Sequence, residues 1–78
     1  MTKHTPRKIE SYATRITFAN GRTWDPQLGA EFSAEVHAQQ YAEIFPDLRE
    51  ITLTPCYVNH RGEVYGDERQ AQTFRFPA

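Results

Sequence analysis

Asn20-Gly21 stands between two short runs that favour β-strands, residues 16–19 and 22–24. Both central residues of a type I′ turn need positive φ angles, which Asn and Gly adopt at low cost. An Asn-Gly pair between β-rich runs is therefore a strong short-range signal for a hairpin. We predict a type I′ hairpin here, and with it a small domain organised on an antiparallel sheet.

The run that leads into this turn, residues 8–19, alternates in the manner of a strand with one buried face. That face is formed by Tyr12, Thr14, Ile16 and Phe18. We expect its last two members to point into the core. Residues 22–25 are the expected return strand, with Trp24 as the apolar residue. Pro26 is expected to stop further pairing because proline cannot donate to a strand ladder.

Residues 33–45 predict one amphipathic helix. Ser33 suits the N-cap because its hydroxyl can accept a hydrogen bond from an unpaired N–H of the first turn. Pro46 disfavours helical geometry at Phe45 and so ends the helix. At about 100° per residue, one stripe faces the core; it comprises Ala34, Ala38, Tyr41 and Phe45. The solvent side comprises Glu35, Gln39, Glu43 and the apolar Val36.

Three further segments complete the expected fold. Residues 50–58 predict a strand in which Pro55 indicates an edge position or a bulge. Residues 57–65 predict a second hairpin, whose four-residue turn ends at Gly62. Residues 71–76 are a candidate fifth strand. The order β-β-α-β-β predicts an α+β, two-layer fold: an antiparallel sheet of four to five strands with one amphipathic helix packed on one face.

With 78 residues, the chain is long enough for one domain. We expect residues 1–7 to form a flexible basic tail and residues 8–78 a single small α+β domain. A single cysteine, Cys56, excludes an intramolecular disulfide and fits a reducing compartment. No stretch approaches the ~20 apolar residues of a membrane span. A cytoplasmic protein that does not bind membranes is therefore expected.

The residue types that carry chemistry form no diagnostic pattern. The candidate metal ligands are His4, His37, Cys56 and His60. They lack the paired spacing of a structural zinc site, and the four glycines are isolated, so there is no phosphate-binding loop. A cysteine nucleophile would need a shaped pocket, which a core this thin rarely provides. We therefore expect no metal site, no cofactor and no enzymatic activity.

Charge is unevenly placed, although the net charge is only −1. Residues 1–22 carry five Lys or Arg and one Glu, whereas residues 23–50 carry six Asp or Glu and one Arg. The first segment is therefore +4 and the second −5. An acidic segment can complement a basic surface on a larger protein, including one that itself binds nucleic acid. The expected partner contacts are Asp25, Glu31, Glu35 and Glu43.

The alternative hypothesis is a small sheet-based protein that binds RNA or DNA. It would use the basic opening segment, with Lys3, Arg7, Lys8, Arg15 and Arg22. However, a pI near 6.3 lacks the basic footprint that nucleic-acid-binding domains usually carry. Aromatic side chains are also needed for the small core. A protein partner is therefore the favoured hypothesis, and nucleic acid the second.

A chain of about this size, with one helix on a small antiparallel sheet and a charged face, resembles small phage-encoded inhibitors of bacterial defence, including several anti-CRISPR proteins. The resemblance covers the architecture of the whole chain and includes no diagnostic motif. It implies a non-enzymatic inhibitor or adaptor that binds a CRISPR effector complex and blocks nucleic-acid binding. The place of action that it implies is the cytoplasm of the bacterial host cell.

Overall fold

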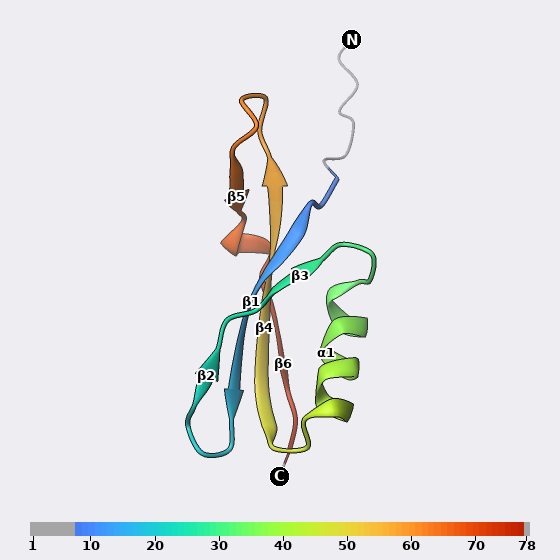
Figure 1. The fold of residues 1–78 in the computed structure, drawn as a ribbon, viewed down its shortest axis with the longest axis vertical. Helices are drawn as coiled ribbons and strands as arrows, with labels where there is room; N and C mark the ends of the chain where they lie inside the picture. Colours follow the sequence, from blue (N-terminus) through green and yellow to red (C-terminus); the bar gives the residue numbers. More distant parts are fainter. Residues whose placement is uncertain (1–7, 78) are drawn as a thin grey trace.

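The computed structural model describes residues 8–77 and shows one α-helix beside a six-stranded antiparallel sheet (Figure 1). Two long strands, β1 (Ser11–Phe18) and β4 (Leu48–Val58), pair with each other along almost their whole length. Within that pair Ile16 lies opposite Ile51. The predicted α+β class, with one helix and an antiparallel sheet, is confirmed.

Each long strand carries two short strands on its outer edge. On β1 these are β2 (Thr23–Trp24) and β3 (Gln27–Gly29). On β4 they are β5 (Val64–Gly66) and β6 (Gln72–Arg75). Strand β5 follows the second hairpin turn, and a short 3₁₀ helix, η1 (Glu68–Gln70), connects it to β6. The candidate fifth strand is therefore present as β6, and β3 is a strand that the sequence pattern did not predict.

Two prolines lie at the gaps between these short strands. Pro26 separates β2 from β3, but pairing with β1 resumes at Gln27, opposite Ala13. The prediction that Pro26 stops the pairing was wrong, because a proline removes only its own hydrogen bond. Pro55 lies in the central strand β4, yet its carbonyl points outward and accepts from the Asp67 N–H at 2.9 Å. The Pro55 nitrogen, which carries no hydrogen, therefore faces the gap between β5 and β6. Among the described residues, no strand is paired with this edge of β4 at Pro55, so no ladder hydrogen bond is lost.

The first hairpin does not use the predicted type I′ turn. Gly21 N–H donates to the Phe18 carbonyl at 2.9 Å, and Phe18 N–H donates to the Arg22 carbonyl at 2.9 Å. Gly21 has φ +86°, whereas Asn20 does not have a positive φ. This is a three-residue loop with a type I turn and a glycine bulge. Asn20 contributes instead through its Oδ1, which accepts from Arg22 N–H at 2.9 Å.

The second hairpin repeats this loop. Asn59 N–H donates to the Glu63 carbonyl at 2.9 Å, and Gly62 N–H donates to the Asn59 carbonyl at 3.0 Å. Gly62 has φ +82°, in the left-handed region. The Asn59 side chain accepts two backbone hydrogen bonds within the turn, from Arg61 and Glu63. The predicted turn ending at Gly62 is confirmed.

Helix α1 (Ala34–Ile44) packs against β4 and β6 on one side of the sheet (Figure 1). Ser33 is the N-cap, as predicted, because its Oγ accepts from Val36 N–H at 3.2 Å. The helix ends at Phe45, whose N–H donates to the Tyr41 carbonyl at 2.8 Å. Among residues 8–77, no helix is both long enough and apolar enough to cross a membrane.

The core lies between α1 and the sheet face formed by alternate residues of the long strands. Its buried members are Tyr12, Ile16, Leu28, Ala34, Ala38, Leu48, Ile51 and Leu53. Phe18, Tyr41, Phe45 and Phe74 pack against them while partly exposed. The predicted inward face of β1 and the predicted buried stripe of the helix are both confirmed. This packing fixes which side of α1 is turned to solvent.

Candidate binding surfaces

The solvent side of α1 forms an acidic ridge, defined here as Glu35, Gln39 and Glu43. All three side chains are exposed, as the helical pattern predicts. The two carboxylates are eight residues apart, or about 12 Å along the helix. None of the ion pairs formed among residues 8–77 involves either of them, and residues 34–44 contain no Lys or Arg. The ridge therefore presents uncompensated negative charge.

The other two expected partner contacts lie elsewhere. Asp25 follows β2 and is joined to Arg15 by two hydrogen bonds of 2.9 Å, from Nε to Oδ1 and from Nη2 to Oδ2. Glu31 precedes α1 and folds over Gly29, where a larger residue would collide with its carboxylate. Of the four expected contacts, the structure thus brings only Glu35 and Glu43 together on one helix face.

The pairing of Asp25 with Arg15 bears on both binding hypotheses. The hydrogen bonds from Arg15 lower the pKa of the Asp25 carboxyl below its usual value, and the same contact raises the pKa of the Arg15 guanidinium. Each group therefore stays charged and has its partner within the chain. Neither is a free charge available to a ligand without breaking this pair.

The basic residues proposed for nucleic-acid binding do not gather on one surface. Lys3 and Arg7 lie outside the described residues. Arg15 is on β1 and paired with Asp25, Arg22 is exposed in the first hairpin turn, and Lys8 precedes β1. The three of these residues that the structure describes therefore form no continuous stripe of positive charge along β1.

The sheet face opposite α1 is polar and open. Thr52 and Thr73 join β4 to β6 by a hydrogen bond of 2.8 Å between their hydroxyls. Arg75 also donates to Glu50 across these strands at 2.9 Å. A shallow hollow of about 420 Å³ lies over this face. By strand alternation the aromatic side chains of β1, β2 and β6 lie on the α1 face instead, so within residues 8–77 these three strands place no ring on the open face on which a base could stack.

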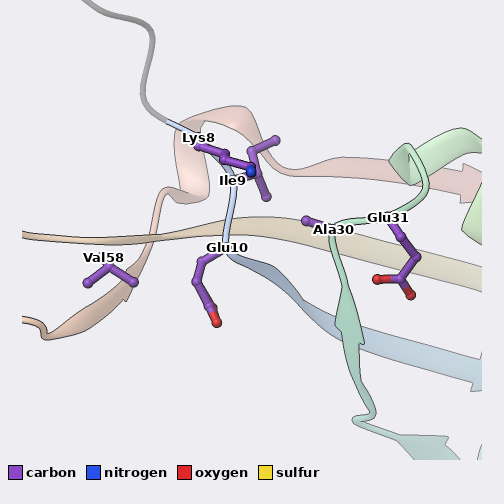
Figure 2. A pocket seen from close by; sticks show the side chains of 6 residues that line it. All are labelled: Lys8, Ile9, Glu10, Ala30, Glu31 and Val58. Carbon is purple, nitrogen blue, oxygen red and sulfur yellow. The ribbon is translucent and has the colours of Figure 1, made fainter.

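A second hollow, of about 680 Å³, lies between the start of β1, the end of β3 and β4 (Figure 2). Its walls carry an ammonium from Lys8 and carboxylates from Glu10 and Glu31, with Val58 on another side. Within residues 8–77, no three His, Cys, Asp or Glu side chains are grouped so that they could hold a metal ion. Among the residues that the structure describes, none that lines this hollow is a Ser, Cys or His.

His37 and Cys56 are buried and have structural partners. His37 Nε2 donates to the Gly29 carbonyl at 2.8 Å, which fixes its tautomer and ties α1 to β3. Its ring also packs edge-to-face against Tyr12. Cys56 Sγ lies 3.6 Å from the Thr54 carbonyl. The sequence indicated His37 only as a candidate metal ligand, and its burial was not predicted.

An apolar flank borders the acidic ridge; we define it as Trp24, Phe32, Val36 and Ile44. These are exposed large apolar side chains, with Trp24 45% and Ile44 65% exposed. The sequence predicted only Val36 among them. Trp24 was predicted to be the apolar residue of its strand, but its exposure depends on how far α1 covers β2. That is a property of the packed fold and has no local signal.

Comparison of the chain with protein-family models, with curated proteins and with solved structures gave no match. Its function must therefore be inferred from its own surfaces.

Proposed function

We propose that the protein is a non-enzymatic inhibitor or adaptor that binds a larger protein through the acidic ridge of α1. The observation that carries the proposal is the pair of exposed carboxylates Glu35 and Glu43, which form no ion pair within residues 8–77 and lie on a helix without a Lys or Arg. Such a face attracts a basic surface over a Debye length of about 8–10 Å and increases the rate of encounter.

A basic surface large enough to complement this ridge is typical of proteins that bind nucleic acid. The ridge would then occupy positions that phosphates otherwise fill, and the protein would inhibit its partner by competition. The narrower version, in which the partner is a CRISPR effector complex in the cytoplasm of a bacterial cell, rests on the architectural resemblance alone.

Charge reversal tests the proposal. The variant Glu35→Lys/Glu43→Lys changes the ridge, and Glu63→Lys/Glu68→Lys makes the same change in net charge at exposed positions of the second hairpin and η1. Wild type and both variants are used as baits in a lysate of the native cell, with thermal unfolding as the folding control. We expect a salt-sensitive partner to be captured by wild type and by the hairpin variant only. Capture of the same partners by all three would contradict the proposal.

The nucleic-acid alternative makes a different prediction. The pairing of Arg15 with Asp25 and the absence of rings from the open sheet face argue against it. We expect the purified protein to show no affinity for single-stranded or duplex oligonucleotides even at low ionic strength. Binding that weakens steeply as salt is added would favour the alternative instead.

A further inference from the structure

The apolar flank is exposed although it adjoins a well-packed core. The Trp24 ring lies 6.0 Å from the Tyr41 ring and 5.9 Å from the Phe45 ring, yet almost half of its surface faces solvent. Ile44, in the last turn of α1, is more exposed still. A helix that buries Tyr41 and Phe45 only partly therefore leaves apolar surface uncovered beside them.

Phe32 and Ile44 lie on the side of α1 that carries His37. Val36 lies on the adjoining solvent side, next to the acidic ridge. Ile44 follows His37 by seven residues, two helical turns, so the two share a side. That side faces the edge of β1 occupied by β2 and β3, because His37 donates to Gly29 of β3. Phe32 packs edge-to-face on His37, with ring centroids 5.6 Å apart. The flank thus runs from Phe32 along α1 towards Trp24 of β2.

The opposite side of α1 gives the contrast. There the helix packs against β4 and β6, and Phe74 and Phe76 are partly buried against the core. The two sides of the helix therefore differ in exposure: Phe74 and Phe76 are partly buried at the β6 edge, whereas Trp24 at the β2 edge stays 45% exposed although its ring packs on Tyr41 and Phe45. An open apolar flank that includes a tryptophan is typical of a protein-binding surface, in which a few aromatic and aliphatic anchors carry most of the energy.

The charges beside the flank indicate what could cover it. Glu35 precedes Val36, and Glu43 precedes Ile44, so each of these anchors has a carboxylate next to it in sequence. A second copy of this chain would bring the same carboxylates face to face, which is unfavourable. The occupant must instead combine apolar side chains with Lys or Arg. Val36 and Ile44 are eight residues apart, as are Glu35 and Glu43, which is about 12 Å along α1. Apolar and basic groups that recur at this distance fit an amphipathic helix laid along α1.

We propose that the apolar flank and the acidic ridge together form the docking site for an amphipathic, cationic helix of the partner. This inference rests on the proposed function and specifies its partner. The apolar side chains of the incoming helix cover Trp24, Val36 and Ile44, and its basic side chains reach Glu35 and Glu43. The ridge supplies attraction at a distance, and the flank supplies burial after contact.

The single tryptophan of the chain, Trp24, reports this contact directly. Its fluorescence is followed while two synthetic peptides of equal length and charge are added: a helical leucine–lysine peptide with separate apolar and basic faces, and a lysine–glycine peptide without leucine. We expect the leucine–lysine peptide to bind about tenfold more tightly and to shift the Trp24 emission to shorter wavelength, because burial of one large apolar side chain is worth about a factor of ten or more.

Two double variants test whether the peptide contacts the apolar flank. Val36→Gln/Ile44→Gln should reduce the affinity for the leucine–lysine peptide to that for the lysine–glycine peptide, whereas Val58→Thr/Val64→Thr, at exposed positions of the second hairpin, should change neither affinity. The inference would be overturned if wild type bound both peptides with equal affinity. It would also be overturned if Val36→Gln/Ile44→Gln bound the leucine–lysine peptide as tightly as wild type does; in either case only the acidic ridge would remain as the contact. Unchanged binding of the lysine–glycine peptide by Glu35→Lys/Glu43→Lys would contradict the proposed function instead.

Discussion

The two ends of the sheet are stabilised in different ways. Where α1 packs on it, Ile16, Ile51 and Leu53 are fully buried. The hairpin of β4 and β5 extends away from the helix (Figure 1). There Val58 and Val64 lie opposite each other and remain exposed, although the Tyr57 and Tyr65 rings on the neighbouring positions pack at 5.9 Å. Most of the buried apolar area therefore belongs to the helix-covered end.

This difference bears on function. A binding surface loses less conformational entropy when the element that carries it is already fixed by packing. The acidic ridge and the apolar flank are both built around α1, at the well-packed end. The β4–β5 hairpin has fewer buried contacts and is expected to open locally at lower free-energy cost than the core.

The largest expected effect contrasts one buried and one exposed aliphatic residue. Ile51→Ala should destabilise the fold by about 2–5 kcal/mol, because it leaves a cavity in the centre of the core. That is a large part of the roughly 4–12 kcal/mol expected for a domain of this length. Val64→Ala, in the hairpin, should change stability by no more than about 0.5 kcal/mol. Urea denaturation measures both, and similar losses would refute the contrast.

The two loop glycines provide a finer comparison. Gly21 and Gly62 have nearly the same φ, and neither would place a new Cβ within 4 Å of another atom. Alanine at either site should therefore cost about 1–2 kcal/mol through the backbone alone. Gly21→Ala should lower global stability by that full amount. Gly62→Ala should lower it less, because local opening of the hairpin relieves the strain.

Amide hydrogen exchange separates these cases. In Gly62→Ala, exchange should accelerate in residues 57–66 and stay unchanged in the strands beneath α1. Equal losses of global stability in the two variants, with exchange accelerated throughout, would mean that the hairpin unfolds only together with the core.

The smallest expected effect concerns the exposed pair of Arg15 and Asp25. Since its folded pKa is lowered, Asp25 stabilises the fold above the ordinary carboxyl pKa of about 3.9, and this contribution is lost as pH falls through the lowered value. Asp25→Asn should therefore melt slightly below wild type at pH 5–7, and the difference should shrink below about pH 4. Thermal unfolding at several pH values measures it; a difference that does not depend on pH would exclude the ion pair as its source.

Local signals predicted much of this fold. The cap at Ser33, the helix end before Pro46 and the alternation along β1 each depend on neighbours in sequence. Strand β3 has only three residues, and its pairing depends on the long partner strand. The turn at Asn20 was mispredicted because the observed loop has three residues, so the chain does not require a positive φ there.

The candidate site also contains features that depend on sequence neighbours and features that depend on the packed fold. Exposure of Glu35 and Glu43 follows from the period of the helix, so the ridge could be predicted. The pairing of Asp25 with Arg15 depends on contact between residues ten positions apart across two strands. The exposure of Trp24 and Ile44 depends on where α1 ends over the sheet. Neither has a signature in the local sequence.

Hydrogen exchange of the protein with and without the leucine–lysine peptide tests most directly whether the partner surface is on the helix-covered end. We expect slower exchange in residues 32–45, where the ridge and most of the flank lie, and no change in residues 57–66 of the hairpin. Slowing in the hairpin with none in the helix would contradict a partner surface on the helix-covered end.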